Sequence, residues 1–373
     1  MFSLYGYNQN LDHDKFCIVI EQSKTFYLLG QNKFLAKMKI AVCGMGVAGS
    51  YLMARLKENH DVVGFERMNE KDHDSICAWG SSKSKMQELC KKADIDFEKY
   101  IIHDGKNLYI EINDEHKFDI KLKGLCTYDK IGIIRDMTKG CKVHYGITPK
   151  LSDLERDFDL IVDATGFYRM YLPKPSNDFY LPTYQYKIEY ENKVPMDDFY
   201  VKPFRGITGY FWYFPLSKNL AHIGAGDYRK NHVKETDEFL KKYGGKITKT
   251  VGRPIRLATP DRCEPFYHGK VVGVGESIGT VYPLLGEGII PSMICADIFI
   301  KNMGNNEKYR KEVLTYFAIY SKVLKFVLSK MKGEFSFIKQ FADLLSIFRY
   351  MKKNEDRFGM EIHIRDLVKV AKA

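Results

Sequence analysis

The sequence lacks the cysteine patterns of a metal centre or a disulfide framework. Its eight cysteines are scattered over 373 residues without a CxxC pair, which excludes the common zinc and thioredoxin-like motifs. No apolar run reaches the ~18 residues of a membrane-spanning helix, and no basic segment followed by a long apolar core marks a secretory signal. We therefore expect a cytoplasmic protein with free thiols and without a metal ion.

The composition is that of a soluble globular protein. Hydrophobic residues make up 45% of the chain and charged residues 28%, and the length supplies a large core and two or three domains. Residues 1–37 show no strong pattern beyond the short apolar runs FCIVI and FYLL. We expect this segment to be an over-extended start, with translation beginning at Met38. A small hairpin added to the edge of the fold is the alternative.

Positive charge is concentrated at the C-terminal end. From Lys301 onward the chain carries 16 Lys or Arg against 8 Asp or Glu, which accounts for +8 of the net charge of +11. Six apolar residues there share one face at helical spacing: Val313, Tyr316, Phe317, Tyr320, Leu324 and Val327. A basic amphipathic region of this kind suits contact with an anionic membrane surface. We favour the simpler interpretation, helices that pack on the main domain with their lysines in solvent, and we expect no nucleic-acid binding because no recognition motif accompanies the charge.

A glycine-rich stretch follows Met38 directly. IAVC (40–43) predicts a short buried strand, GMGVAG (44–49) a turn, SYLMARLKEN (50–59) a helix, and DVVGFE (61–66) a second strand. Gly44 permits the tight turn, Gly46 lets backbone N–H groups approach a pyrophosphate, and Gly49 allows close packing of helix on strand. Glu66 is placed to accept hydrogen bonds from ribose hydroxyls and disfavours a 2′-phosphate. The register therefore predicts FAD or NAD rather than NADP.

Two later segments favour FAD over NAD. DLIVDATG (159–166) predicts a strand followed by a turn that contains Asp163 and Gly166. The stretch 269–300 gives another strand ending at Gly275-Glu276, after which Gly286-Glu287-Gly288-Ile289 opens an apolar helix. A glycine-rich helix N-terminus offers free backbone donors to a second part of the cofactor. An NAD fold does not need this return more than 200 residues after the first loop, whereas an extended FAD does.

The middle of the chain predicts an antiparallel sheet. PTYQYKIEYEN (182–192) and GYFWYFPLSKNLAHIGAGDY (209–228) have period-2 character, and the second turns back through SKN. We expect this sheet to roof the cofactor and to supply a long, dry, apolar cleft. Such a cleft suits a polyprenyl chain better than a sugar or a peptide.

The motifs, taken in order, resemble those of the geranylgeranyl reductase family of flavoproteins in the p-hydroxybenzoate hydroxylase superfamily. The resemblance covers about residues 38–310 and is carried by the GxGxxG loop with Glu66, CAWG (77–80), YFWYFP (210–215) and VGVGE…PLLGEGI (271–289). It implies an α/β fold with a Rossmann-like FAD-binding domain (38–170 and 265–310). An inserted antiparallel β-sheet substrate domain (171–264) and a basic helical C-terminal region (311–373) complete the expected organisation.

The cofactor-binding residues that we expect come from the glycine loops, the strand ends and CAWG. They are Gly44, Gly46, Val47, Ala48, Gly49, Glu66, Cys77, Ala78, Gly80, Asp163, Gly166, Gly275, Glu276, Gly286, Gly288 and Ile289. The family's aromatic substrate motif matches Tyr210, Trp212, Phe214 and Pro215. The sequence departs from the family at Glu276, where the family has aspartate, and Lys130 is a candidate for an arginine that the family has after CAWG.

Cys77 has two interpretations. The resemblance implies that CAWG lies against the flavin ring, where a thiol can contact the ring or take part in proton delivery. A cysteine in a buried turn is otherwise a small apolar residue. We favour flavin contact and treat Cys77 as the candidate catalytic residue.

The resemblance implies reduction of isolated C=C bonds in a geranylgeranyl or other polyprenyl chain, carried on a lipid or a prenyl diphosphate. Reduced flavin supplies a hydride, and NAD(P)H or a ferredoxin-like protein supplies the electrons. A flavin monooxygenase or halogenase on the same scaffold is the first alternative. A redox-sensing flavoprotein without enzymatic activity is the second.

Overall fold

The computed structural model describes residues 37–74, 77–112, 116–191 and 194–372. The expectation about residues 1–37 therefore concerns a segment that lies, except for its last residue, outside the described part. The first sheet has six strands in the order β15-β16-β9-β1-β2-β8, and all neighbours are parallel except β15 and β16. Their bounds are β1 Lys39–Cys43, β2 Asp61–Glu66, β8 Lys142–Tyr145, β9 Leu160–Asp163, β15 Tyr267–His268 and β16 Val271–Gly273.

The strand order reverses between β1 and β9, and this places a crevice at their carboxyl ends. The GxGxxG loop follows β1 and the DATG turn follows β9, so both predicted cofactor loops open into the same crevice. The loops touch: Gly44 has φ +93°, and a Cβ at this position would lie 2.6 Å from the carbonyl oxygen of Ala164. Only glycine fits both the conformation and the contact.

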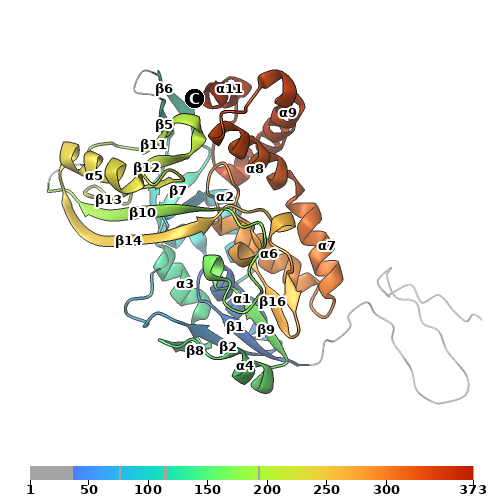
Figure 1. The fold of residues 1–373 in the computed structure, drawn as a ribbon. Coiled ribbons are helices and arrows are strands. Elements are labelled where there is room, and N and C mark those ends of the chain that lie inside the picture. The colour runs from blue at the N-terminus through green and yellow to red at the C-terminus, as the bar shows by residue number, and fades with distance from the viewer. Residues whose placement is uncertain (1–36, 75–76, 113–115, 192–193, 373) are drawn as a thin grey trace, which may run out of the picture. The chain divides into compact units, whose positions relative to one another are not determined.

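Helices cover both faces of this sheet (Figure 1). On one face α1 (Val47–Leu56) packs against α3 (Lys130–Thr138) and α6 (Ile289–Lys301), and α4 (Leu151–Asp157) packs against β9 on the other. The predicted apolar helix α6 is buried at ten of its 13 positions. A helix largely surrounded by protein needs little polar surface, which explains its mostly apolar sequence.

The second sheet has seven strands in the order β14-β10-β13-β12-β11-β5-β6. The bounds are β5 Asn107–Ile112, β6 His116–Lys121, β10 Tyr180–Glu189, β11 Phe199–Pro203, β12 Gly209–Pro215, β13 Leu220–Asp227 and β14 Lys246–Arg256. β12 and β13 form the predicted antiparallel hairpin. One face packs against α5 (His232–Tyr243).

The expected boundary of the inserted sheet, 171–264, misses two strands. β5 joins the sheet through parallel pairing with β11, and β6 pairs with β5. This pairing brings together Leu108 and Phe199, which are far apart in the sequence. Local alternation of apolar residues does not reveal which distant strand a segment will join.

A third, smaller sheet has three strands in the order β3-β7-β4. It comprises β3 Gly80–Ser82, β4 Ile101–Asp104 and β7 Leu125–Tyr128, with α2 (Lys83–Lys91) after β3. β3 begins with the last residue of CAWG, so the sheet fixes the exit of that motif.

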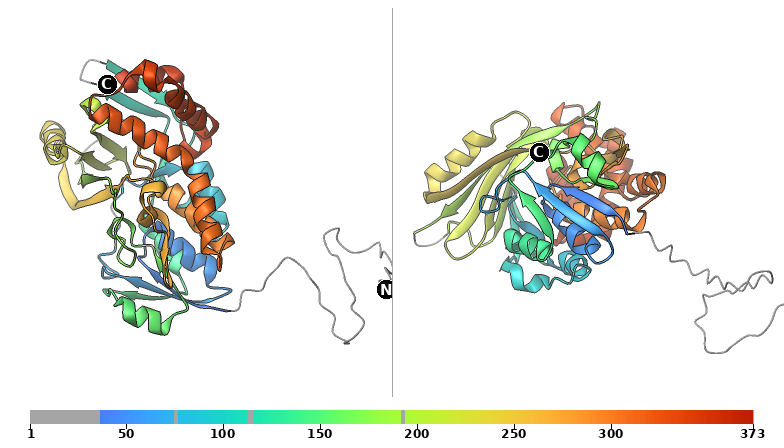
Figure 2. Two further views of the ribbon diagram at one scale, coloured as in Figure 1. Left: turned by 45° about the vertical axis from the view of Figure 1, so that its right-hand side comes forward. Right: turned by 90° about the horizontal axis from the view of Figure 1, so that it is seen from below.

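The C-terminal region is helical, as predicted. It contains α7 Asn306–Tyr316, α8 Ala318–Met331, α9 Phe337–Lys353, α10 Glu355–Phe358 and α11 Ile364–Lys372. The predicted apolar face is buried except for Tyr316, because α7 ends there and α8 starts a new helix. Of these helices, α7 lies beside α6 and α11 lies next to β6 (Figure 1), and Leu122 after β6 forms a bridge with Met360. Figure 2 shows the same helices from two further sides.

Within the described ranges, no helix is both long and apolar enough to cross a bilayer. The same ranges hold no group of three or more His, Cys, Asp or Glu arranged to bind a metal ion.

Candidate active site

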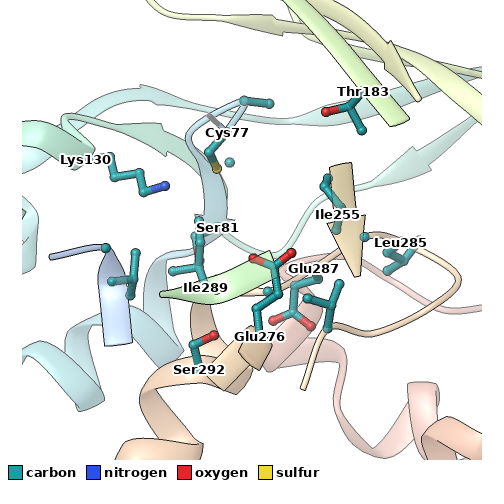
Figure 3. Close-up of a pocket in the computed structure, with 18 of the residues that line it drawn as sticks. Cys77, Ser81, Lys130, Thr183, Ile255, Glu276, Leu285, Glu287, Ile289 and Ser292 are labelled. Carbon is teal, nitrogen blue, oxygen red and sulfur yellow. The ribbon is translucent and has the colours of Figure 1, made fainter. Parts of the chain in front are cut away.

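One cavity of about 680 Å³ is lined by both large sheets and the C-terminal helices. We call the part lined by Gly46, Glu66, Gly166, Glu276 and Gly288 the dinucleotide end. We call the part between β5, β11 and α11 the apolar arm. Figure 3 shows part of the cavity lining, with Cys77 and Lys130 on one side and Glu276, Glu287 and Ser292 on the other.

The dinucleotide end has room for a phosphate at the N-terminus of α1. A Cβ on Gly46 would meet nothing within 4 Å, and no side chain caps this helix. The first-turn amides therefore remain available to an anion, and the helix dipole favours one there. α6 begins in the same way after Gly288, also without a side-chain cap. The cavity thus has two helix N-termini for a long anionic cofactor.

Glu66 is held in place by backbone donors. Its Oε2 accepts the Met45 N–H at 2.9 Å and its Oε1 accepts the Met68 N–H at 3.0 Å. His73 Nε2 lies 3.7 Å from Oε2, and burial lowers the pKa of His73, which favours a neutral ring at neutral pH. The fixed carboxylate at the cavity edge fits the predicted contact with a ribose.

Most of the predicted site residues line this cavity. They are Gly44, Gly46, Val47, Ala48, Glu66, Cys77, Ala78, Gly80, Gly166, Glu276, Gly286, Gly288, Ile289, Tyr210, Trp212 and Phe214.

Four predicted site residues do not line the cavity: Gly49, Asp163, Gly275 and Pro215. The Asp163 carboxylate is used within its own turn, where it accepts the Thr165 N–H, the Thr165 hydroxyl and the Tyr171 N–H. Gly49 faces the Gly44 carbonyl and Gly275 faces Ser292. The Pro215 carbonyl accepts a hydrogen bond from Thr127. In the structure these four residues shape the loops around the cavity.

Glu276 interacts with two arginines that were not predicted from the sequence. Its Oε1 accepts the Arg256 backbone N–H at 2.9 Å, and its Oε2 pairs with Arg253 at 3.0 Å. Arg256 is buried and also pairs with Asp178. The side chain is one carbon longer than the family's aspartate, and these contacts fix its carboxylate at the cavity.

The loop before α6 carries a buried ion pair. Arg357 Nη2 donates to Glu287 Oε2 at 2.6 Å and to the Tyr320 hydroxyl at 2.6 Å, and Nη1 donates to Tyr350. Glu287 Oε1 has no hydrogen-bond partner among the described residues. Burial raises the pKa of Glu287, while Arg357 opposes that change. Arg357 lies in α10, 70 residues further along the chain, and only the general basic charge of that region was visible in the sequence.

The CAWG segment is fixed by three contacts. The Trp79 N–H donates to Cys77 Sγ at 3.3 Å, with Trp79 in the left-handed region at φ +62°. Gln185 Nε2 donates to the Cys77 carbonyl at 3.1 Å. The His222 ring packs edge-on against Trp79 with centroids 4.9 Å apart, and burial lowers the pKa of His222 to about 4.

Lys130 is the other polar group at this wall. Its side chain is almost fully buried, and burial lowers its pKa. Its amine extends toward Cys77 (Figure 3), and no hydrogen bond or ion pair to another described residue satisfies it. The resemblance to the family was the only sequence signal for this residue.

The aromatic motif contacts both neighbouring walls. Tyr210 donates to the Leu285 carbonyl at 2.5 Å, the Trp212 indole N–H donates to Gln185 Oε1 at 3.2 Å, and Phe214 covers Gly80, where a Cβ would lie 2.3 Å from the Phe214 ring. The motif therefore joins the second sheet to the loop before α6 and to CAWG.

Beyond the aromatic motif the lining of the cavity becomes mainly aliphatic, with Glu361, His363 and Asp366 as polar residues of the C-terminal segment. The second sheet contributes aliphatic side chains to one side of the arm, and the C-terminal segment contributes the other. The residues are Leu108, Ile110, Ile120, Val201, Ile207, Met360, Ile362, Leu367 and Val370. The arm exists only because β5 joined the second sheet and α11 covers it, and neither feature was predicted.

No protein-family model matches the chain. An uncharacterized protein of Methanocaldococcus jannaschii is 27% identical over 340 residues, which cover 78% of this chain and 91% of that protein. Among solved structures, a geranylgeranyl bacteriochlorophyll reductase-like protein from Thermoplasma acidophilum superimposes with a TM-score of 0.66 at 16% identity, covering 89% of this chain and 95% of that one.

Two further solved structures share the fold. The flavin-dependent halogenase CmlS gives a TM-score of 0.60 at 16% identity, over 91% of this chain and 77% of that one. A probable FAD-dependent monooxygenase from Pseudomonas aeruginosa gives 0.54 at 14% identity, over 80% and 99%. The predicted α/β fold, with a Rossmann-like domain, an antiparallel sheet and a helical C-terminus, is confirmed, and it is the fold of these flavoproteins.

Proposed function

We propose that the protein is an FAD-dependent oxidoreductase that reduces isolated C=C bonds of a polyprenyl chain. The cofactor assignment is supported by two uncapped helix N-termini, open space above Gly46 and the fixed Glu66 carboxylate in one cavity. FAD is long enough to use both helix ends, whereas one dinucleotide loop would serve NAD. Glu66, Gly46 and Gly288 would hold it.

The observation that carries the substrate assignment is the apolar arm. It leaves the same cavity beyond Trp212, and Leu108, Val201 and Leu367 line it. The lining of this channel is mainly aliphatic, and its polar residues, Glu361, His363 and Asp366, all come from the C-terminal segment. Such a channel is better suited to burying a long hydrocarbon than to orienting a sugar or a peptide. Tyr210, Trp212 and Phe214 would flank the chain where it passes the cofactor.

Bound and reduced, FAD supplies a hydride for one carbon of the double bond. The other carbon needs a proton, and we assign its delivery to Cys77 Sγ, which lines the cavity and is oriented by the Trp79 N–H. Lys130 extends toward this thiol (Figure 3) and can return the proton. The aliphatic walls exclude water from the bond being reduced.

The remaining assignments concern the partners. Electrons come from NAD(P)H or a ferredoxin-like protein, and the substrate carries a diphosphate or a lipid head group. The basic C-terminal helices lie beside the apolar arm and are suited to a peripheral contact with an anionic membrane.

The test is an anaerobic turnover experiment. The purified protein is scanned for the visible flavin spectrum, reduced with dithionite, and mixed with geranylgeranyl diphosphate or an unsaturated archaeal-type ether lipid. We expect reoxidation of the flavin and a mass gain of two hydrogens per reduced bond. Absence of flavin would refute the cofactor assignment. Reoxidation by oxygen alone, with a hydroxylated or halogenated aromatic acceptor, would replace the reductase by a monooxygenase or halogenase.

A further inference from the structure

Gln185 lies on β10 between two parts of the cavity wall. Its side chain is buried, with 3% of the residue exposed. Nε2 donates to the Cys77 carbonyl at 3.1 Å, and Oε1 accepts the Trp212 indole N–H at 3.2 Å. The indole N–H can only donate and a carbonyl can only accept, so the two partners fix the orientation of the amide.

Trp212 has little freedom to leave this contact. Its ring is buried against β13, where a Cβ on Gly224 would lie 2.5 Å from it. Tyr210 packs edge-on against the same ring with centroids 5.8 Å apart. A buried indole with these two contacts presents its N–H in a defined direction, and Gln185 Oε1 is the acceptor that it meets.

At the Cys77 end of the bridge, the local hydrogen bond from the Trp79 N–H to Cys77 Sγ comes with a strained backbone. Trp79 has a left-handed backbone conformation, which is costly for a residue with a large side chain. Within the described part of the chain, Gln185 is the side chain that holds the Cys77 carbonyl. Without it, the strain at Trp79 can relax and the Cys77 thiol loses its direction.

We propose that Gln185 is a positioning residue that couples Trp212 to Cys77. Through it the aromatic motif orients the CAWG segment and the Cys77 thiol, in addition to flanking the substrate. The bridge joins two motifs that lie 135 residues apart, CAWG and YFWYFP. It explains why a tryptophan serves at this position, since phenylalanine offers the same apolar face but no N–H. The hydrogen-bonded bridge itself does not depend on the proposed function. Only its expected effect on bound FAD rests on that proposal.

The test uses the rate at which iodoacetamide alkylates Cys77, followed by peptide mass spectrometry in the FAD-loaded protein. Gln185→Met removes both hydrogen bonds at nearly constant volume, and Trp212→Phe removes only the N–H donor. We expect the rate to rise by about twofold to tenfold in Trp212→Phe, the range that corresponds to losing one net hydrogen bond, and by at least as much in Gln185→Met, which loses two. Because both variants break the same bridge, the double variant should alkylate at the rate of Gln185→Met alone.

Tyr213→Phe is the matched control. Tyr213 is also buried on β12, and its hydroxyl donates to the Met196 carbonyl at 3.2 Å, away from Cys77. We expect it to lower Tm without changing the alkylation rate of Cys77. The visible spectrum of bound FAD is the second readout and should change in the bridge variants but not in the control.

Each outcome decides the question. Wild-type alkylation rates in Gln185→Met and Trp212→Phe would overturn the proposal, as would a Tyr213→Phe rate raised to the same extent. If Gln185→Met does not fold, Trp212→Phe alone decides. A wild-type protein that binds no FAD would refute the proposed function instead, and the Cys77 rates, measured without the cofactor, would still test the bridge.

Discussion

Replacing Arg357 by methionine removes the cation that neutralises Glu287 in the cavity wall. Arg357 is buried, with 4% of its side chain exposed, and the change removes its hydrogen bonds to Glu287, Tyr320 and Tyr350. Breaking a buried pair on one side leaves an uncompensated charge and costs about 3–5 kcal/mol. For a chain of this length that corresponds to a fall in Tm of about 4–7 °C.

The loss should depend on pH in a defined direction. Burial raises the pKa of Glu287 even with Arg357 present, and removing the cation raises it further. A carboxyl whose pKa is higher in the folded state than in the unfolded state destabilises the fold above its unfolded pKa. As the pH falls through the folded pKa, Glu287 becomes neutral, so the difference in Tm between variant and wild type should shrink in acid.

The measurement is calorimetric unfolding of wild type, Arg357→Met, Glu287→Gln and the double variant between pH 5 and 8. Glu287→Gln keeps the shape but leaves Arg357 without its carboxylate. The double variant has no buried charge at this site, so it should be more stable than Arg357→Met at pH 8. A loss below about 1 kcal/mol in Arg357→Met, or a double variant that shows the sum of the two single losses, would refute the ion-pair reasoning.

Three further predictions use the same structure. Gly44→Ala should cost about 3 kcal/mol or more, because φ is +93° and a Cβ would lie 2.6 Å from the Ala164 carbonyl; an unchanged Tm would contradict this packing. Burial lowers the pKa of His222 in the folded protein from 6.5 to about 4. As the pH falls, the unfolded chain therefore protonates this histidine at a higher pH than the folded protein does, and stability should fall between about pH 6.5 and 4. His222→Phe should reduce that slope in pH-dependent unfolding, and an identical slope would exclude His222 as its source. Leu367→Trp should fill the apolar arm and weaken turnover of a twenty-carbon chain by about tenfold or more, with FAD affinity unchanged; equal turnover of long and short chains would place the substrate elsewhere.

The cofactor loops could be predicted from the sequence because their residues lie close together in the chain. Gly44, Gly46 and Glu66 lie within one strand-turn-helix-strand unit, and the spacing alone fixes their relation. Asp163 belongs to a loop of the same kind, yet its carboxylate turned out to be used by Thr165 and Tyr171. A sequence identifies the turn, but it does not show which side chains form hydrogen bonds within that turn.

The parts that could not be predicted depend on long-range pairing. β5 joined a sheet whose other main strands begin 70 residues later or more, and Arg357 reached Glu287 across the same distance. A buried arginine and a surface arginine look alike in a basic helical segment. The predicted stripe at Val313–Val327 did mark the buried face, but it concealed the helix break after Tyr316.

These long-range contacts give the C-terminal helices a place in the candidate site. Arg357 fixes the loop that opens α6, at the dinucleotide end, while Leu367 and Val370 on α11 cover the apolar arm. α10 and α11 are separated by only five residues, so a displacement of this short segment would disturb the loop before α6 and the apolar arm together. The region can therefore be basic and still line the cavity. Its lysines face solvent on the outer surface, while Arg357, Leu367 and Val370 lie on the inner surface that closes the cavity.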